Sequence, residues 1–249
     1  MSERANSASI SGAGRISGGT YDRVTISGAG KVIGDLAANE LRISGAGKVE
    51  GKVRAREIVV SGSTTFTDSV HGDEMRVSGS ARIEGRVEVK ELKCSGSIKV
   101  HGGISAQYLK SSGHLQVDGD VSAEIFKASG GFQIEGLLSA DHVEIAIGGT
   151  CLVQEIGGER IDVRRGGWRE KGILFDGLIK LFTGGGTAEL RAGLIEGDEV
   201  HLEDTIADTV RGKTVEIGPG CKIGTVEYSE SLRVASGAKV KNKSRLGSE

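Results

Sequence analysis

The chain has 249 residues and a formal net charge of −2, with 41 glycines and a single proline, Pro219. A chain so close to neutral has no general electrostatic attraction to nucleic acid, so we expect no nucleic-acid partner. Aromatic residues make up only 4% of the sequence, which argues against a sandwich or barrel built around an aromatic core. The near-absence of proline is consistent with continuous β-ladders, since strands inside a sheet need their backbone N–H groups.

The segment of residues 1–9 is short and polar, and it lacks the apolar stretch of a secretory signal. No run of the sequence reaches the roughly 18 apolar residues that a membrane span requires. The three cysteines, Cys94, Cys151 and Cys221, form no CxxC pair, which favours a reducing compartment. We therefore expect a cytoplasmic chain whose residues 1–9 form a flexible tail.

From Ile26 to Glu144 the sequence repeats with a strict 17-residue period. A related unit that is one residue short precedes the series, and serine and glycine occupy the second and third positions of every unit. A fixed period of this length is the signature of a repeat architecture. The units begin at Ile10, Ile26, Ile43, Val60, Val77, Cys94, Ser111 and Ala128.

Three positions of the unit predict its core. Position 7 and position 16 are apolar in every copy, and position 11 is apolar in all but the first, where Thr20 fills it. Short β-branched segments between glycine turns predict strands. A unit this short cannot close its own core, so we expect an all-β chain whose units stack as coils of a parallel β-helix over residues 10–163. Glycines are expected at the corners, where a close approach or a positive φ is required.

The sequence shows no residue combination typical of catalysis or metal binding, so we expect no enzyme activity and no cofactor. The five histidines occupy different repeat positions and are expected to be isolated surface residues. The serine column lacks a recurring histidine or carboxylate to activate it. An acidic column beside a basic column predicts a salt-bridged, solvated face rather than a polyanion site. These columns are Glu40, Glu57, Glu74 and Glu91, and Arg42, Arg76, Lys93, Lys110 and Lys127.

Residues 164–187 match no repeat and are expected to be an irregular insert. Apolar residues recur there at helical spacing, which predicts a short amphipathic helix near residues 172–183. Two interpretations stay open: the segment packs on its own protein, or it contacts a membrane surface or partner, because basic residues flank it. The candidate contact residues are Trp168, Leu174, Phe175, Leu178, Leu181 and Phe182.

A less regular coil pattern returns over residues 188–240, followed by a charged, flexible tail at 241–249. The pairs Val200/Leu202, Val215/Ile217 and Leu232/Val234 supply one apolar pair per turn, and Ile206, Ile223 and Val240 form a second column. We interpret this as a C-terminal β-solenoid segment. The spacing leaves open whether it continues the first solenoid or folds back beside it.

The units of the form I-S-G-x-G-x-[VI]-x-G, clearest over Ile10–Glu144, resemble those of the bactofilins. These are bacterial polymer-forming cytoskeletal proteins. The resemblance implies a right-handed parallel β-helix that self-assembles end to end, without nucleotide, into cytoplasmic filaments. It further implies a scaffold for cell shape, envelope or motility, often near the membrane, with itself or a paralogous bactofilin as partner.

Physical reasoning on the chain ends agrees with self-assembly. The end coil of a β-helix presents unpaired strand edges, which can join another chain unless they are covered. The first unit is no more polar than the inner ones, whereas a capping repeat normally has a polar outer face. The predicted self-association end is therefore Ile10, Ile16 and Val24.

Two other classes of protein remain alternatives. One is a non-polymerising adhesin or partner-binding β-helix. The other is a hexapeptide-type acyltransferase, although three hexapeptides make a turn that is one residue longer than the observed period.

Overall fold

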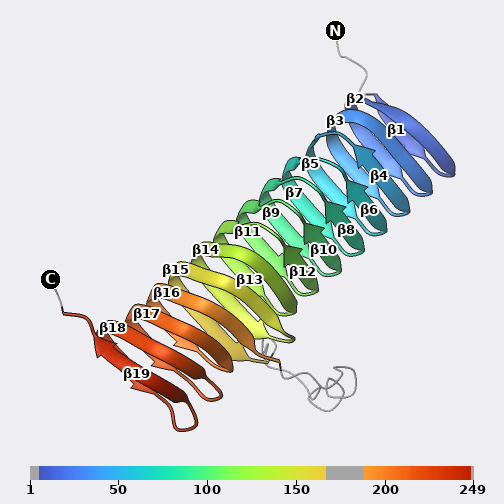
Figure 1. The fold of residues 1–249 in the computed structure, drawn as a ribbon. Coiled ribbons are helices and arrows are strands. Elements are labelled where there is room, and N and C mark those ends of the chain that lie inside the picture. Colours follow the sequence, from blue (N-terminus) through green and yellow to red (C-terminus); the bar gives the residue numbers. More distant parts are fainter. Residues whose placement is uncertain (1–5, 167–187, 248–249) are drawn as a thin grey trace, which may run out of the picture. The chain divides into compact units, whose positions relative to one another are not determined.

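The computed structural model describes residues 6–166 and 188–247, and every helix or strand assigned in these ranges is a β-strand. The chain divides into two compact units, residues 1–124 and 125–249. Within each unit, strands of successive coils pair in parallel, so the predicted all-β parallel solenoid is confirmed (Figure 1). The helix expected near residues 172–183 lies outside the described residues.

The strands of the first unit are β1 (Ser7–Ile10), β2 (Ala13–Ile26), β3 (Ala29–Ile43), β4 (Ala46–Glu50), β5 (Val53–Val60), β6 (Ser63–Phe66), β7 (Val70–Val77), β8 (Ser80–Ile83), β9 (Val87–Cys94), β10 (Ser97–Val100), β11 (Ile104–Ser111) and β12 (His114–Val117). The first unit begins with β1 and two long strands, β2 and β3, after which short strands alternate between two ladders. β13 (Val121–Ala128) spans the boundary between the units.

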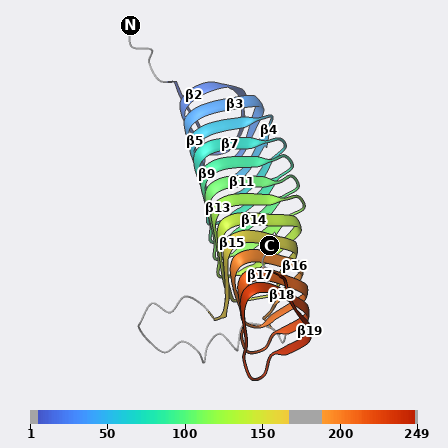
Figure 2. The same ribbon diagram turned by 90° about the vertical axis from the view of Figure 1, so that its left-hand side faces the viewer.

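In the first unit the coils are in register with the 17-residue period. β5 pairs with β7 and β7 with β9, which places Val53, Val70 and Val87 one above another. Figure 2 shows β5, β7, β9 and β11 following one another along one side. The column predicted at position 7 is confirmed as core, since Val32, Val49 and Phe66 are fully buried.

Two core columns of the first unit compensate for each other in size. Where position 1 is isoleucine, position 5 is glycine, and a Cβ built on Gly30 would lie 2.5 Å from Cγ2 of Ile26. Further along, position 1 shrinks while position 5 grows, as in the unit with Ser111 and Leu115. The two positions share one volume, and close packing makes their sum nearly constant from coil to coil.

The glycine at position 3 is required by the approach of one coil to the next. A Cβ on Gly79 would lie 2.0 Å from the carbonyl oxygen of Gly62 and 2.4 Å from that of Ser61. The amide of Gly79 also donates to the carbonyl of Val60 at 3.2 Å. Of the two reasons expected for glycine at the corners, the close approach is the one that applies at this position.

The second unit has longer strands, and the lengths of its coils vary. The strands are β14 (Gly131–Ile147), β15 (Cys151–Arg165), β16 (Leu190–Leu202), β17 (Thr205–Ile217), β18 (Lys222–Val234) and β19 (Lys239–Arg245). β15 pairs in parallel with β16, opposing Val163 and Leu202. The C-terminal segment thus continues the ladder of β15 and does not fold back beside it.

Two predicted columns are wrong by one residue. Leu36 opposes Gly19 rather than Thr20, because the repeat that begins at Ile10 is one residue short and the register shifts there. Ile206 opposes Lys222 and is half-buried, whereas Ala207 opposes Ile223 and is buried. In both places a local change in coil length moved the side chain that faces inward.

The ladder also extends beyond the predicted solenoid at both ends. β1 includes Ser7–Ser9, which pair with β2, and β19 runs through Arg245 and pairs with β18. The polar composition of both segments suggested tails, but terminal coils can carry polar residues because part of their side chains faces solvent. The division at 124/125 also differs from the predicted one, which separated residues 10–163 from 188–240.

Candidate assembly surface

The N-terminal coil of the first unit presents an open strand edge. Within the described residues, β1 pairs with β2 alone, through Ala8 opposite Val24 and Ile10 opposite Ile26. The next part of this coil, around Ile16, pairs on one side with β3, where Ile16 opposes Val32. Strand edges of this kind leave backbone N–H and C=O groups available to another chain.

The three residues predicted at this end lie at different depths. Val24 is fully buried between the neighbouring coils, so Ala8, not Val24, lies in the outer layer. Ile10 is buried and its Cγ2 packs over Gly14. Ile16 is half-buried. The accessible apolar residues of the terminal coil thus include Ile16 and Ala8, which are half-buried, and Ala13, which is exposed.

Tyr21 contacts the backbone where the first repeat, which begins at Ile10, is one residue shorter than the others. Its hydroxyl donates a hydrogen bond to the carbonyl oxygen of Ser17 at 2.9 Å. A Cβ on Gly19 would lie 3.6 Å from the tyrosine ring, so the ring covers the backbone of Gly19. This role of Tyr21 was not predicted from the sequence. A tyrosine beside the position where the repeat lacks a residue could have indicated it.

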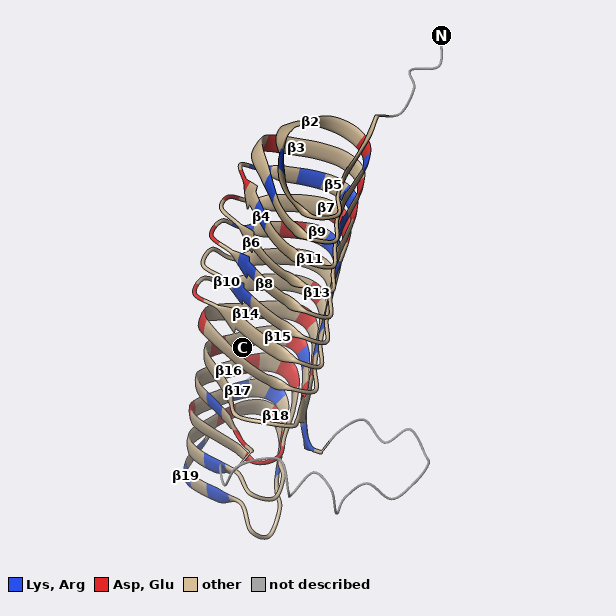
Figure 3. Ribbon diagram, turned by 90° about the vertical axis from the view of Figure 1, so that its right-hand side faces the viewer, with Lys and Arg blue, Asp and Glu red and all other residues tan. Residues whose placement is uncertain are grey.

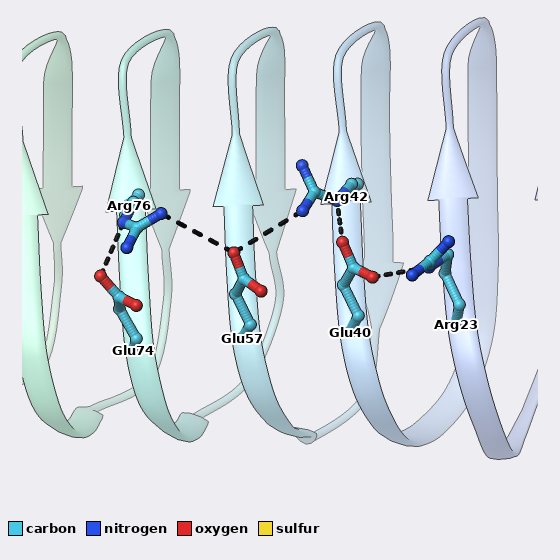
Figure 4. Close-up of polar contacts among 6 residues, drawn as sticks. All are labelled: Arg23, Glu40, Arg42, Glu57, Glu74 and Arg76. Carbon is cyan, nitrogen blue, oxygen red and sulfur yellow. Dashed lines mark hydrogen bonds and ion pairs between the residues drawn. The ribbon is translucent and has the colours of Figure 1, made fainter.

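The charged columns form a ladder along the first unit (Figure 4). Glu40, whose side chain is 12% exposed, accepts from Arg23 at 2.5 Å and also pairs with Arg42. Glu57 lies 3.7 Å from Arg42 and 3.8 Å from Arg76. The predicted salt-bridged face is therefore confirmed. The ion pairs neutralise the basic column from Arg42 to Lys93.

Three histidines contact carboxylates and are not isolated, which corrects the expectation. His71 Nε2 lies 3.0 Å from Glu88, His101 Nδ1 lies 2.6 Å from Asp118, and His201 Nδ1 lies 3.0 Å from Asp162. Each is only about 30% exposed at its side chain. Across residues 6–166 and 188–247 no group of three or more metal-ligating side chains comes together.

The three cysteines are free and buried. Burial raises the pKa of each thiol to about 11, because the interior disfavours the thiolate. A thiol in that state is a poor nucleophile near neutral pH. Cys94 is 2% exposed and acts as a small core residue.

The C-terminal coil differs from the N-terminal one. In β19, Val240 opposes Ile223 and Lys243 opposes Val226. Val226 is fully buried and faces the core, so Lys243 occupies an inward position at the end of an apolar column. No sequence pattern predicted this, because the irregular coil length hid the register.

The candidate contact residues Trp168, Leu174, Phe175, Leu178, Leu181 and Phe182 lie outside the described residues, so their role stays a prediction. In the part of the chain that the structure describes, no helix is long and apolar enough to cross a bilayer.

Comparison with known proteins adds to this geometry. Residues 5–102 match the family model of the bactofilins, described as polymer-forming cytoskeletal. This part of the chain is therefore similar to the bactofilins. The predicted resemblance is thereby confirmed for this part of the chain, which includes the terminal coil and most of the first unit's ladder.

Two similar proteins come from Bacillus subtilis (strain 168). Over 97 residues the chain is 42% identical to the uncharacterized protein YhbF, covering 38% of this chain and 34% of YhbF. Over 57 residues it is 49% identical to the uncharacterized protein YhbE, covering 23% of this chain and 24% of YhbE. The match thus spans about a third or less of each relative. No solved structure matches the chain significantly.

Proposed function

We propose that the chain is a non-catalytic scaffold subunit that self-associates end to end through the outer edge of its N-terminal coil. The assemblies are nucleotide-independent filaments in the cytoplasm that organise cell shape, envelope or motility. The observation that carries this proposal is the open edge of β1 and β2. On this edge Ala8 and Ile16 are only half-buried, because within the described residues no further coil covers them.

Two further facts support it. The matching family is described as polymer-forming. The inner coils already stack on one another through backbone ladders and shared apolar columns, so a second copy that adds to the edge repeats contacts the chain uses internally. The same reasoning makes a paralogous bactofilin an acceptable partner. Peripheral membrane contact through the 164–186 segment is a separate proposal, carried by its sequence alone.

Substituting Ile16 by lysine tests the edge. Ile16→Lys places a charge in the outer layer of the terminal coil, where a monomer can keep the ammonium in water but an assembled contact would bury it. We expect sedimentation velocity to show large assemblies for the unmodified chain and a discrete small species for Ile16→Lys. Circular dichroism should show the same β-content for both.

Ile33→Lys is the matched control, because Ile33 is 43% exposed on the side of the solenoid in β3. This variant should assemble like the unmodified chain. Assembly of Ile16→Lys at the unmodified level would contradict the proposed edge, and loss of assembly only in Ile33→Lys would move the contact to the side of the coils.

A further inference from the structure

The last described strand carries a basic side chain at every second position. β19 has the sequence KVKNKSR, with Lys239, Lys241, Lys243 and Arg245 and no acidic residue. All four are exposed, and Figure 3 shows the basic segments along β19. Within the described residues, β19 pairs only with β18, so its outer edge is open.

Inner coils of the second unit match their charges between neighbours. Arg211 lies 3.0 Å from Glu196 on the preceding coil and 2.7 Å from Glu227 on the following one. Lys213 pairs with Asp198 at 2.9 Å. At these positions a basic side chain meets a carboxylate of the adjacent coil.

On β19 no such pairing between coils occurs among residues 6–166 and 188–247. None of its three lysines forms an ion pair with a described residue, and Arg245 donates only to the carbonyl oxygen of Ser229, at 3.3 Å. The matching carboxylates would have to lie on whatever strand stands next to β19.

The position of Lys243 indicates what kind of strand that is. Ile195, Val210 and Val226 form a buried column, and Lys243 follows Val226 in register. A further coil with an apolar residue there would bury an unpaired ammonium, which is strongly unfavourable.

We propose that the outer edge of β19 binds an acidic, extended segment of a partner protein. The segment adds as a parallel or antiparallel strand, its backbone completes the ladder, and its carboxylates face the basic side chains of β19. Addition of a strand to an open edge is an established mode of peptide recognition, in which backbone hydrogen bonds supply affinity and side chains supply specificity. In a head-to-tail filament, the segment would compete for this edge with the N-terminal coil of a second copy.

A peptide fits these observations better than a membrane surface. Val240 opposes the buried Ile223, so its neighbours Lys239 and Lys241 point away from the core, whereas Lys243 opposes the buried Val226. A membrane plane cannot meet side chains on both faces of one strand. A lysine-rich edge can also serve only to keep strands from aggregating, and the experiment must separate that role from binding.

The test is fluorescence anisotropy with a labelled peptide of alternating glutamate and threonine and the full chain at low salt. We expect saturable binding that weakens at high salt. The variant Lys239→Glu/Lys241→Glu/Lys243→Glu should bind about tenfold or more weakly, because charge complementarity is inverted. The control Lys52→Glu/Lys99→Glu/Lys110→Glu, with the same charge change in the first unit, should bind like the unmodified chain.

A second peptide separates strand addition from general attraction. Replacing its threonines by proline removes backbone donors while keeping every glutamate, and this peptide should not bind. Equal binding of both peptides, equal loss in both triple variants, or no binding at all would overturn the proposal. Binding to phosphatidylglycerol vesicles without binding to the peptide would overturn it in favour of a membrane contact.

Discussion

Replacing Gly79 by alanine is expected to destabilise the first unit by about 3 kcal/mol or more, since a new methyl must be forced into a packed site. The clash is with backbone, at 2.0 Å from Gly62 and 2.4 Å from Ser61. No rotamer change can relieve it, so two coils must move apart and lose ladder hydrogen bonds. Chemical denaturation followed by circular dichroism measures the loss.

Gly12 provides the matched control. It occupies the same repeat position in the first coil, where a Cβ would meet nothing within 4 Å. Gly12→Ala should therefore leave the free energy of unfolding nearly unchanged. Equal losses in both variants would show that the glycine column serves some local backbone need rather than the approach between coils.

The second large effect is expected at Phe132 in the second unit. Its ring is 2% exposed and meets that of Phe126 edge-on, with centroids 5.7 Å apart. Phe132→Ala removes this contact and leaves a cavity, so we expect a loss of about 4 kcal/mol. The measurement is again equilibrium unfolding in denaturant.

The size compensation between positions 1 and 5 supplies a rescue for this variant. Phe132 occupies position 5 of the unit that begins with Ala128, whereas another unit combines Val77 with Ala81. Ala128→Val combined with Phe132→Ala recreates that pair and should recover part of the loss. A double variant no more stable than Phe132→Ala would contradict the shared volume of positions 1 and 5.

Ile206→Ala should lower the free energy of unfolding only slightly, because Ile206 is half-buried and opposes Lys222.

Much of the fold was predictable because the 17-residue period makes one inference apply to every coil. The column of Val32, Val49 and Phe66 needed only alternation and period to be recognised. Where the coil length changed, prediction failed by one residue, at Gly19 and at Ala207. Without neighbours in strict register, the sequence contains no marker of which side chain faces inward.

The candidate surfaces also include residues that the repeat located and residues that it did not. The repeat placed Ile10 and Ile16 in the first coil, and their role in self-association stays a prediction. Lys243 was not predictable, since its inward position depends on the register of β19 with Val226. The residues around Trp168 were selected by helical spacing alone, and their role stays a prediction.

Negative-stain electron microscopy of the purified full chain, with and without nucleotide, tests the central claim most directly. The account predicts filaments in both conditions for the unmodified chain and for Ile33→Lys, and their absence for Ile16→Lys. A discrete monomer or dimer of the unmodified chain at high concentration would contradict end-to-end self-association.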